Sequence, residues 1–449
     1  MEEFLLVDKA CTLFEQSSGC RMHRDPTSQK CKFLPLGKWR TSLKQEDVPL
    51  PYLRLTESLD YLGCKLCATY QASKKENGII LVKKINDLIS CWKSGKFLPL
   101  TSRPWSLNSF CLSKIWYRLA CLEVKVGDLE KIISTMKSWL YQDSILKPPE
   151  NVLYRSPENG GLGLHHVKTR AQALMIHTFL AQAISPRYSR NHYLHSLYRW
   201  HVLEDRNMKN PGRPPYYSEK FFSIIRSVKL TSNLCLPWIT VKQWSKLLLE
   251  RGITHTSEPD SPPKLIPTKL ELLHPNCNLE NSYRITRLFG LSPEKKSFLF
   301  RMLHNLLPNK ERLHRIKKVA TPHCVFCTGL YLDDMEHLFV CPKYRQIIEP
   351  LLKVVKTVLP DSTIPQIVTL QITLEESMEF PVIWLISTTL MLVWNARKAG
   401  KDLSFISFKA EVQAELEILK STQWRHFALH NSALLLDQLL ENHLWVDQS

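Results

Sequence analysis

Three cysteines and one histidine with metal-ligand spacing constrain this chain more than any other feature of its sequence. Cys324 and Cys327 form a C-x2-C pair, and His337 and Cys341 complete the pattern C-x2-C-x9-H-x3-C. Thiolate and imidazole groups suit zinc, and four of them close a tetrahedral site. His337 and Cys341 are four residues apart, which places both on one face of a helix. The pattern predicts a structural zinc site with no open position for catalysis.

The charge balance favours a polyanionic partner. The 449 residues include 60 Lys and Arg against 42 Asp and Glu, a formal net charge of +18. Nucleic acid is the simplest partner for such an excess, and a solvated basic surface is the alternative. The 13 cysteines are scattered and odd in number, and Met1-Glu2-Glu3 does not begin a secretory signal. We therefore expect reduced thiols and a location in the nucleus or cytoplasm.

One apolar stretch, residues 380–394, has the composition of a membrane span. It is short for a bilayer that needs about 20 apolar residues, and Ser387, Thr388 and Thr389 lie within it. A buried helix of a globular domain is the preferred interpretation, so we expect no membrane partner.

The N-terminal residues predict a short helix followed by strands. Apolar residues between Phe4 and Phe14 indicate the helix, which Gly19 would end. Residues 30–36 and 60–67 read as two strands. The second contains another C-x2-C pair, Cys64 and Cys67, but no second ligand pair follows at finger spacing. Strand packing is therefore preferred to a second zinc site.

Residues 79–141 predict a small helical bundle. Apolar residues recur at helical spacing over 82–92, 112–119 and 129–140, and a helical pattern resumes over 168–185. Cationic side chains lie around the loops of the bundle, and Lys96 and Arg103 are candidate nucleic-acid contacts.

A glycine-rich run, residues 160–164, invites comparison with phosphate-binding loops. Gly160-Gly161-Leu162-Gly163-Leu164 lacks the third glycine of G-x-G-x-x-G, and no G-K-S/T follows. It predicts a turn in which backbone packs closely against its neighbours. Residues 186–290 are loop-rich, with candidate linkers at 211–217 and 257–263.

The residues before the zinc pattern carry a concentration of positive charge. Pro308-Asn309 marks the start of a helix, which runs on toward the cysteines. A cationic helix beside a zinc site suits phosphate contacts, and a solvated helix face is the alternative. The candidate nucleic-acid contacts here are Arg301, Lys310, Arg312, Arg315, Lys317 and Lys318.

Tyr331-Leu332-Asp333-Asp334 fits the Y-x-D-D string with which polymerases hold catalytic metal ions. It lies in the loop between Cys327 and His337, where it cannot form the strand-turn-strand of a polymerase palm. We interpret it as loop, and the sequence contains no other catalytic string.

In the order of its motifs, the chain resembles the C-terminal part of the reverse transcriptase of LINE-type (non-LTR) retrotransposons. Leu36-Gly37-Lys38-Trp39 and Tyr61-Leu62-Gly63 are similar to palm segments, residues 79–141 to the thumb, and the glycine run to a motif downstream of it. Residues 301–313 with the Cys/His set resemble the reverse-transcriptase zinc-binding domain, and Trp394 with Arg397 its closing helix. The His337–Cys341 spacer is one residue shorter than in many relatives, which leaves His323 as an alternative ligand.

The resemblance implies a fold that is mainly α with a small β remnant. Its expected parts are a palm remnant at 1–70, a thumb-like bundle at 71–150, a connection at 151–280 and a zinc-binding domain at 281–449. The family's nuclease domain and catalytic aspartates would precede Met1, so we expect no polymerase activity.

The resemblance also implies a fragment of a transposable element that binds RNA or DNA, in the first place element RNA. A zinc-stabilised module for a protein partner and an inert relic are the alternatives.

Overall fold

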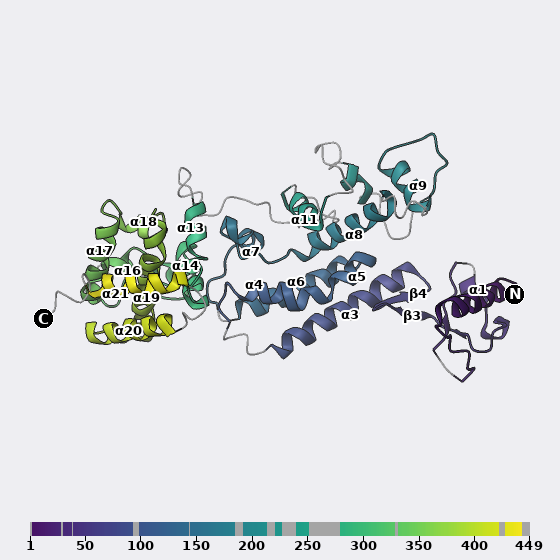
Figure 1. Cartoon of the computed structure of the whole chain (residues 1–449), viewed down its shortest axis with the longest axis horizontal. Coiled ribbons are helices and arrows are strands. Elements are labelled where there is room, and N and C mark those ends of the chain that lie inside the picture. Colours follow the sequence, from purple (N-terminus) through teal and green to yellow (C-terminus); the bar gives the residue numbers. More distant parts are fainter. Residues whose placement is uncertain are drawn as a thin grey trace. The chain divides into compact units, whose positions relative to one another are not determined.

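The computed structural model describes residues 2–27, 30–37, 39–92, 98–142, 144–184, 192–212, 221–226, 239–250, 279–327, 331–421 and 427–441. In these ranges the chain is mainly α-helical with two small sheets, which confirms the predicted fold class (Figure 1). It forms two compact units. The first unit contains Met1–Lys93, Ser109–Lys137 and His166–Lys264, and the second Ser94–Asn108, Ser138–His165 and Leu265–Ser449. These two units differ from the four consecutive segments that the sequence predicts, and that division into four stays a prediction.

The strands all lie near the N-terminus, in the first unit. Strand β1 (Lys32–Phe33) pairs in parallel with β2 (Arg54–Leu55), so the strand expected over 30–36 is shorter. The strand expected over 60–67 is instead a hairpin of β3 (Ser58–Tyr61) and β4 (Cys64–Cys67). Leu62 and Gly63 form its turn with φ of 47° and 82°, because a two-residue hairpin turn of this kind needs two positive φ angles. Cys64 and Cys67 lie in β4, which confirms the strand interpretation.

The first unit is otherwise helical. Helix α1 ends before Gly19, which has the left-handed φ of 73° expected for a C-cap. Helix α3 begins earlier than predicted, because Thr69 caps it by accepting a hydrogen bond of 3.2 Å from the Ala72 N–H. The helical elements of this unit are α1 (Glu2–Ser18), α2 (Trp39–Ser42), a 3-10 turn (Gln45–Asp47), α3 (Tyr70–Cys91), a 3-10 turn (Leu112–Lys114), α5 (Trp116–Cys121), α8 (Val167–Ile184), α9 (His192–His201) and α11 (Val241–Glu250).

Helix α8 organises the packing of the first unit. It contacts α5, α9 and α11. Its buried residues Ile176 and Phe179 belong to one apolar cluster with Trp244 and Leu248 of α11. The two elements at the unit boundaries are a π-helical turn (Leu107–Cys111) and α6 (Val126–Tyr141). The helix expected over 112–119 is instead a 3-10 turn followed by the short helix α5, while α6 covers the helix expected over 129–140.

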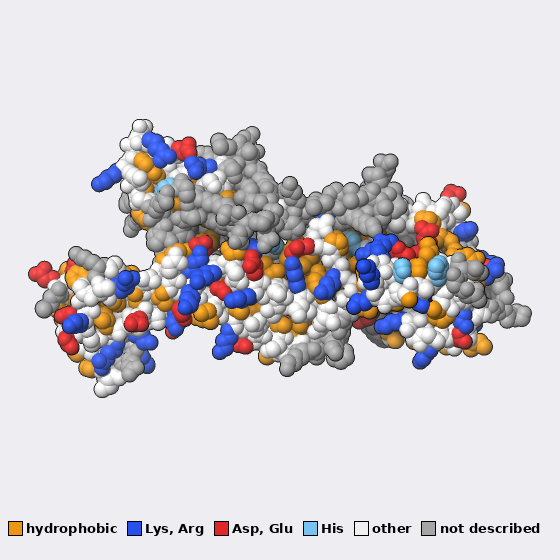
Figure 2. All heavy atoms as spheres, turned by 180° about the vertical axis from the view of Figure 1, so that it is seen from behind, with side chains coloured by type: hydrophobic (Ala, Val, Ile, Leu, Met, Phe, Trp, Pro, Cys, Tyr) orange, Lys and Arg blue, Asp and Glu red, His pale blue; other side chains and the backbone are white. Residues whose placement is uncertain are grey.

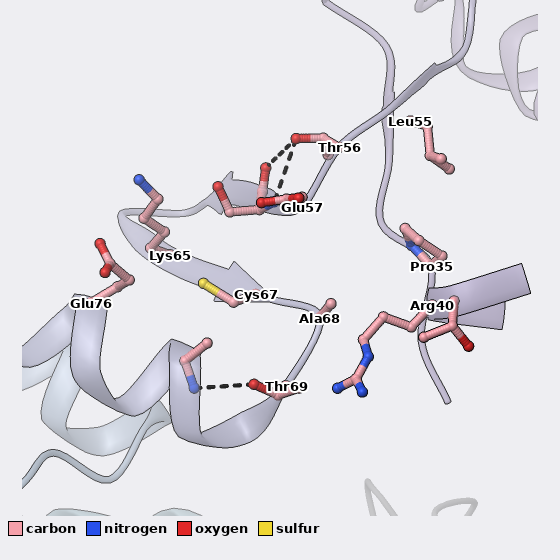
Figure 3. A pocket seen from close by; sticks show the side chains of 13 residues that line it. Pro35, Arg40, Leu55, Thr56, Glu57, Lys65, Cys67, Ala68, Thr69 and Glu76 are labelled. Carbon is pink, nitrogen blue, oxygen red and sulfur yellow. Dashed lines mark hydrogen bonds between the residues drawn. The ribbon is translucent and has the colours of Figure 1, made fainter. Parts of the chain in front are cut away.

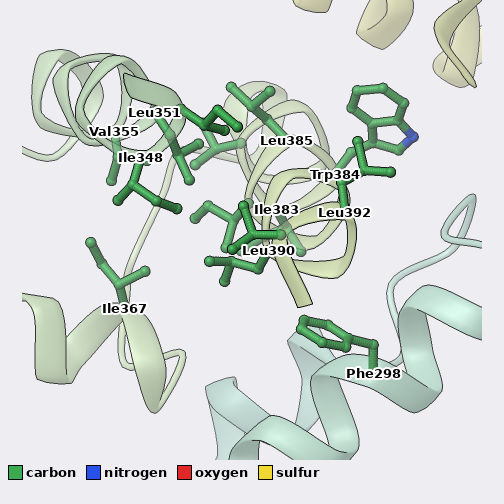
Figure 4. Close-up of a cluster of buried hydrophobic side chains, with 14 of the residues drawn as sticks. Phe298, Ile348, Leu351, Val355, Ile367, Ile383, Trp384, Leu385, Leu390 and Leu392 are labelled. Carbon is green, nitrogen blue, oxygen red and sulfur yellow. The ribbon is translucent and has the colours of Figure 1, made fainter. Parts of the chain in front are cut away.

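The second unit is a helical domain built around α19. Helices α14, α17, α20 and α21 all contact α19, and Figure 4 shows Ile383, Trp384 and Leu390 among residues of the surrounding helices. Its elements are α4 (Arg103–Ser106), α7 (Glu150–Tyr154), a 3-10 turn (Pro157–Asn159), α13 (Glu280–Ile285), α14 (Pro293–Leu303), α15 (Lys310–Arg315), α16 (His337–Val340), a 3-10 turn (Pro342–Tyr344), α17 (Arg345–Val358), α18 (Ile364–Val368), α19 (Glu376–Ala399), α20 (Phe405–Ser421) and α21 (Phe427–Leu439).

The apolar stretch at 380–394 lies in α19 and is the core of this domain. The helix is long and apolar enough to cross a membrane, but 72% of its most apolar window is buried inside the protein. All residues from Glu379 to Val393 except Met391 are buried, including Ser387, Thr388 and Thr389. This confirms the interpretation as a buried helix.

The glycine run is a tightly packed turn, as its sequence predicts. Gly160 has a left-handed φ of 73°, and a side chain there would collide with the ring of Tyr283. Gly161 has no unusual φ, but a Cβ there would meet the backbone carbonyl of Arg155. The turn therefore needs glycine for space as well as for backbone freedom.

Replacing Gly161 tests this packing. We expect Gly161→Ala to lower the free energy of unfolding by about 1–3 kcal/mol, because the colliding atom belongs to the backbone and cannot rotate away. Gly127→Ala in α6 is the control: its Cβ would meet nothing within 4 Å, so we expect a change below about 1 kcal/mol, toward higher stability. Urea unfolding followed by circular dichroism measures both, and equal effects would contradict the packing argument.

Candidate metal centre

The four predicted ligands converge on one point in the second unit. One potential ligand atom of each of Cys324, Cys327, His337 and Cys341 lies within 4.8 Å of the others, and all four residues are buried. The Cys327 Sγ is 3.3 Å from His337 Nε2 and 3.4 Å from Cys341 Sγ. Three thiols and one imidazole in a buried cluster can hold a metal ion, and this donor set is compatible with zinc.

Local structure explains how the ligands are presented. The Cys324 N–H donates to the Tyr331 carbonyl at 2.9 Å, which closes the loop on which the first two cysteines lie. His337 is the first residue of α16 and Cys341 its C-cap, so one helical turn separates them as predicted. His323 forms a single β-bridge with Leu332 and is not part of the cluster, so the structure does not support it as an alternative ligand.

The two aspartates of the Tyr-Leu-Asp-Asp string form contacts that hold their loop in place. The Asp334 carboxylate accepts a hydrogen bond from the His337 N–H at 2.7 Å, at the start of α16. Asp333 is buried, and its carboxylate accepts from the Lys310 N–H at 2.9 Å, at the start of α15. Asp333 also forms an ion pair with Arg397 of α19. The interpretation of this string as loop is confirmed.

Arg397 links this network to the ligands. Its guanidinium donates to the Cys324 Sγ at 3.3 Å and lies over the ring of Phe326, 5.7 Å from the centroid. Burial raises the pKa of the Cys324 thiol, but hydrogen bonds, first of all from Arg397, outweigh burial and lower the pKa overall. A cation thus stabilises the thiolate form of this cysteine, the form that binds metal.

Burial shifts the pKa values of the other three potential ligands. Burial raises the pKa of Cys341 to about 12 and also raises the pKa of Cys327. It lowers the pKa of His337, which keeps the imidazole neutral and able to bind metal. Binding a metal ion must therefore release protons from buried thiols, so affinity rises with pH.

The candidate nucleic-acid contacts fall into distinct environments. The helix expected to carry Lys310 to Lys318 is shorter, because α15 ends at Arg315 and Lys317 has a left-handed φ of 57°. Lys310 and Arg312 are half-buried, whereas Arg315, Lys317 and Lys318 are exposed. With His314, these three form what we call the basic turn, which lines a surface hollow of about 600 Å³.

Three further candidates lie elsewhere. Arg301 is half-buried on α14, and Lys96 lies outside the described residues. Arg103 is 2% exposed, and its guanidinium donates to the carbonyls of Leu98 and Leu140 at 2.8 Å each. The prediction that Arg103 contacts phosphates is wrong, because the side chain is buried and satisfies carbonyl groups of its own unit.

A hollow of about 650 Å³ in the first unit has no matching chemistry. Charges of both signs line it, from Arg40, Glu57, Lys65 and Glu76 (Figure 3). This mixture points to no single class of ligand.

Metal analysis tests the cluster. We expect the purified chain to bind one metal ion, and Cys324→Ser or His337→Ala to lose it, because three remaining ligands leave an open, weaker site. Cys67→Ser in β4 is the control and should keep the metal. Elemental analysis after dialysis measures the metal content of each protein. A chelator should remove the metal at a lower concentration at pH 6 than at pH 8. A metal content unaffected by Cys324→Ser would contradict the assignment.

Neither a protein-family model nor a curated protein matches this sequence.

Proposed function

We propose that this chain is a fragment of a LINE-type retrotransposon reverse transcriptase that binds nucleic acid and has no polymerase activity of its own. The observation that carries the proposal is the coupling of the basic turn to the buried cluster. Asp333 joins the start of α15 to the loop between the ligands, and α15 leads directly into the basic turn. A rigid base for exposed cations is what phosphate binding requires.

The metal in this proposal is zinc in a structural role. Three thiolates and one imidazole complete a tetrahedral shell, which leaves no position for a substrate or an activated water. Cys324, Cys327, His337 and Cys341 would hold the ion, and its contribution is to stabilise the loop and α16. No chemical step passes through it.

The cations that act on nucleic acid are those of the basic turn. Lys317 and Lys318 have no carboxylate partner among the described residues, while Arg315 pairs with Glu311 on the exposed face of α15. Contacts of this kind position a phosphate backbone but do not read bases. The ligand is RNA or DNA, in the first place element RNA, in the nucleus or cytoplasm.

The contacts of the two aspartates are consistent with a binding role without catalysis. Both oxygens of the buried Asp333 carboxylate already have partners, one in the Lys310 N–H and the other in Arg397, and Asp334 accepts from the His337 N–H. On the face drawn in Figure 2, Lys and Arg side chains are scattered among acidic and apolar ones. The proposal therefore rests on the basic turn and not on a charge pattern of this face.

A protein-interaction module is the second candidate. Helix α20 carries Ile406 and Ile418, which are 81% and 62% exposed. The two side chains lie more than three helical turns apart and do not form one patch, but each would lose contact with water under a protein partner, which favours association. In this alternative the zinc site organises a surface for a protein partner and the basic turn is solvated.

The salt dependence of RNA binding tests the proposal. The affinity of a single-stranded RNA should fall steeply with salt concentration, because Lys and Arg contacts release counterions. Lys317→Gln/Lys318→Gln should weaken binding and reduce the slope of log K against log salt by about 1.4–1.8, as expected for two phosphate contacts.

The matched control is Lys356→Gln/Lys401→Gln, which removes the same charge at exposed positions outside the basic turn. Fluorescence anisotropy from 50 to 300 mM salt measures both. Absent or salt-independent RNA binding would overturn the proposal, and equal slopes for the two double variants would overturn the role of the basic turn.

A further inference from the structure

A cavity beside the glycine run is lined by two basic side chains. Its volume is about 340 Å³, within the range of about 300–1,000 Å³ that is typical of small-molecule sites. We call it the glycine-loop cavity, and its lining lies entirely in the second unit. The lining includes Ser102, Gly160, Tyr283, Arg287, Lys296 and His304.

Packing forms one wall of this cavity before any ligand arrives. The ring of Tyr283 is 4% exposed and lies so close to Gly160 that no side chain fits between them. His304 caps the end of α14 and donates from Nε2 to the Gly160 carbonyl at 2.8 Å. Its ring is parallel to that of Tyr283 within 6°, with centroids 6.4 Å apart. A wall fixed in this way lowers the entropy cost of binding.

Two cations line the cavity, and one of them pairs with a carboxylate that lies outside the lining. Arg287 donates to Glu158 at 2.9 Å, but the side chains are 40% and 66% exposed, so this ion pair is weak. Lys296 is half-buried and has no carboxylate partner among the described residues. Burial, and then the charge of Arg287, lower the pKa of Lys296. The two cations therefore repel one another, and an anion between them would remove that repulsion.

We propose that the glycine-loop cavity binds the phosphate group of a nucleotide, with Lys296 and Arg287 as its cationic contacts. A guanidinium offers a planar pair of donors and an ammonium a compact charge, and together they suit the several oxygens of a phosphate. Thr101 and Ser102 add hydroxyl groups to the lining. The cavity is larger than a phosphate ion, which leaves room for the sugar and base.

This proposal is independent of RNA binding at the basic turn. A free mononucleotide and the 5′-phosphate at the end of a strand share the chemistry that the cavity recognises. Loss of RNA binding in the Lys317→Gln/Lys318→Gln variant should leave the cavity unchanged. The two proposals can therefore fail separately.

Titration of the whole 449-residue chain, loaded with zinc, with AMP tests the cavity. We expect AMP to bind and adenosine to bind at least about tenfold more weakly, because only AMP carries the phosphate. Lys296→Gln should weaken AMP binding at least about tenfold, Lys296→Arg should restore it in part, and Lys356→Gln on α17 should leave it unchanged. Circular dichroism and metal content establish that each variant is folded.

A second variant should strengthen AMP binding instead of weakening it. Glu158→Gln removes the carboxylate that competes for Arg287, so AMP should bind about two- to fivefold more tightly, an effect that a purely structural role of Glu158 would not produce. Competition by an oligonucleotide with a 5′-phosphate, but not with a 5′-hydroxyl, would identify a strand end as the source of the phosphate. Absence of such competition would identify a free nucleotide. No AMP binding, equal binding of adenosine, or unchanged binding by Lys296→Gln would overturn the proposal.

Discussion

A buried ion pair between Asp333 and Arg397 is the interaction on which the candidate metal centre of the second unit depends. The two side chains are 6% and 7% exposed, and removing one partner of such a pair costs about 3–5 kcal/mol because the other charge stays buried. Asp333 also holds the first turn of α15, and Arg397 also holds Cys324. Three segments far apart in sequence thus meet at one pair of charges.

The core around α19 gives this pair its environment. Contacts on several sides exclude water from the central part of the helix, and even the hydroxyl side chains there are buried. The same packing buries Lys295 of α14, which pairs with Glu415 of α20 and lies over the ring of Trp384, 4.3 Å from the centroid. Burial lowers the pKa of Lys295 against the opposing effect of Glu415. The carboxylate of Glu415 and the ring face of Trp384 therefore offset the cost of burying the Lys295 ammonium group.

Periodicity and ligand spacing predicted the parts of the structure that local chemistry controls. The helical class, the buried helix at 380–394 and the convergence of Cys324, Cys327, His337 and Cys341 all follow from residues close together in sequence. The start of α3 was missed because Ser73 and Asn77 face inward, and buried polar residues interrupt an apolar pattern. The burial of Arg103 was missed because its partner Leu140 lies 37 residues away. The pairing of Asp333 with Arg397 spans 64 residues, and no local signal indicates it.

The sequence gives no local signal for the glycine-loop cavity either. Arg287 and Lys296 lie on either side of a turn, and Glu158 is more than a hundred residues earlier. Only the fold brings these charges together, so charge counting along the sequence directed attention to the denser cluster at 310–318 instead. The density of basic residues along the sequence therefore indicated the basic turn but gave no indication of the glycine-loop cavity.

The position of α19 within the chain also governs how the second unit can form. Helices α20 and α21 cover part of α19 and follow it in sequence. Since synthesis proceeds from the N-terminus, α19 emerges from the ribosome before the helices that cover it exist. During that interval an apolar segment with the composition of a membrane span is open to lipid, to chaperones and to other nascent chains. Shortening the chain at its C-terminus would make that transient exposure permanent.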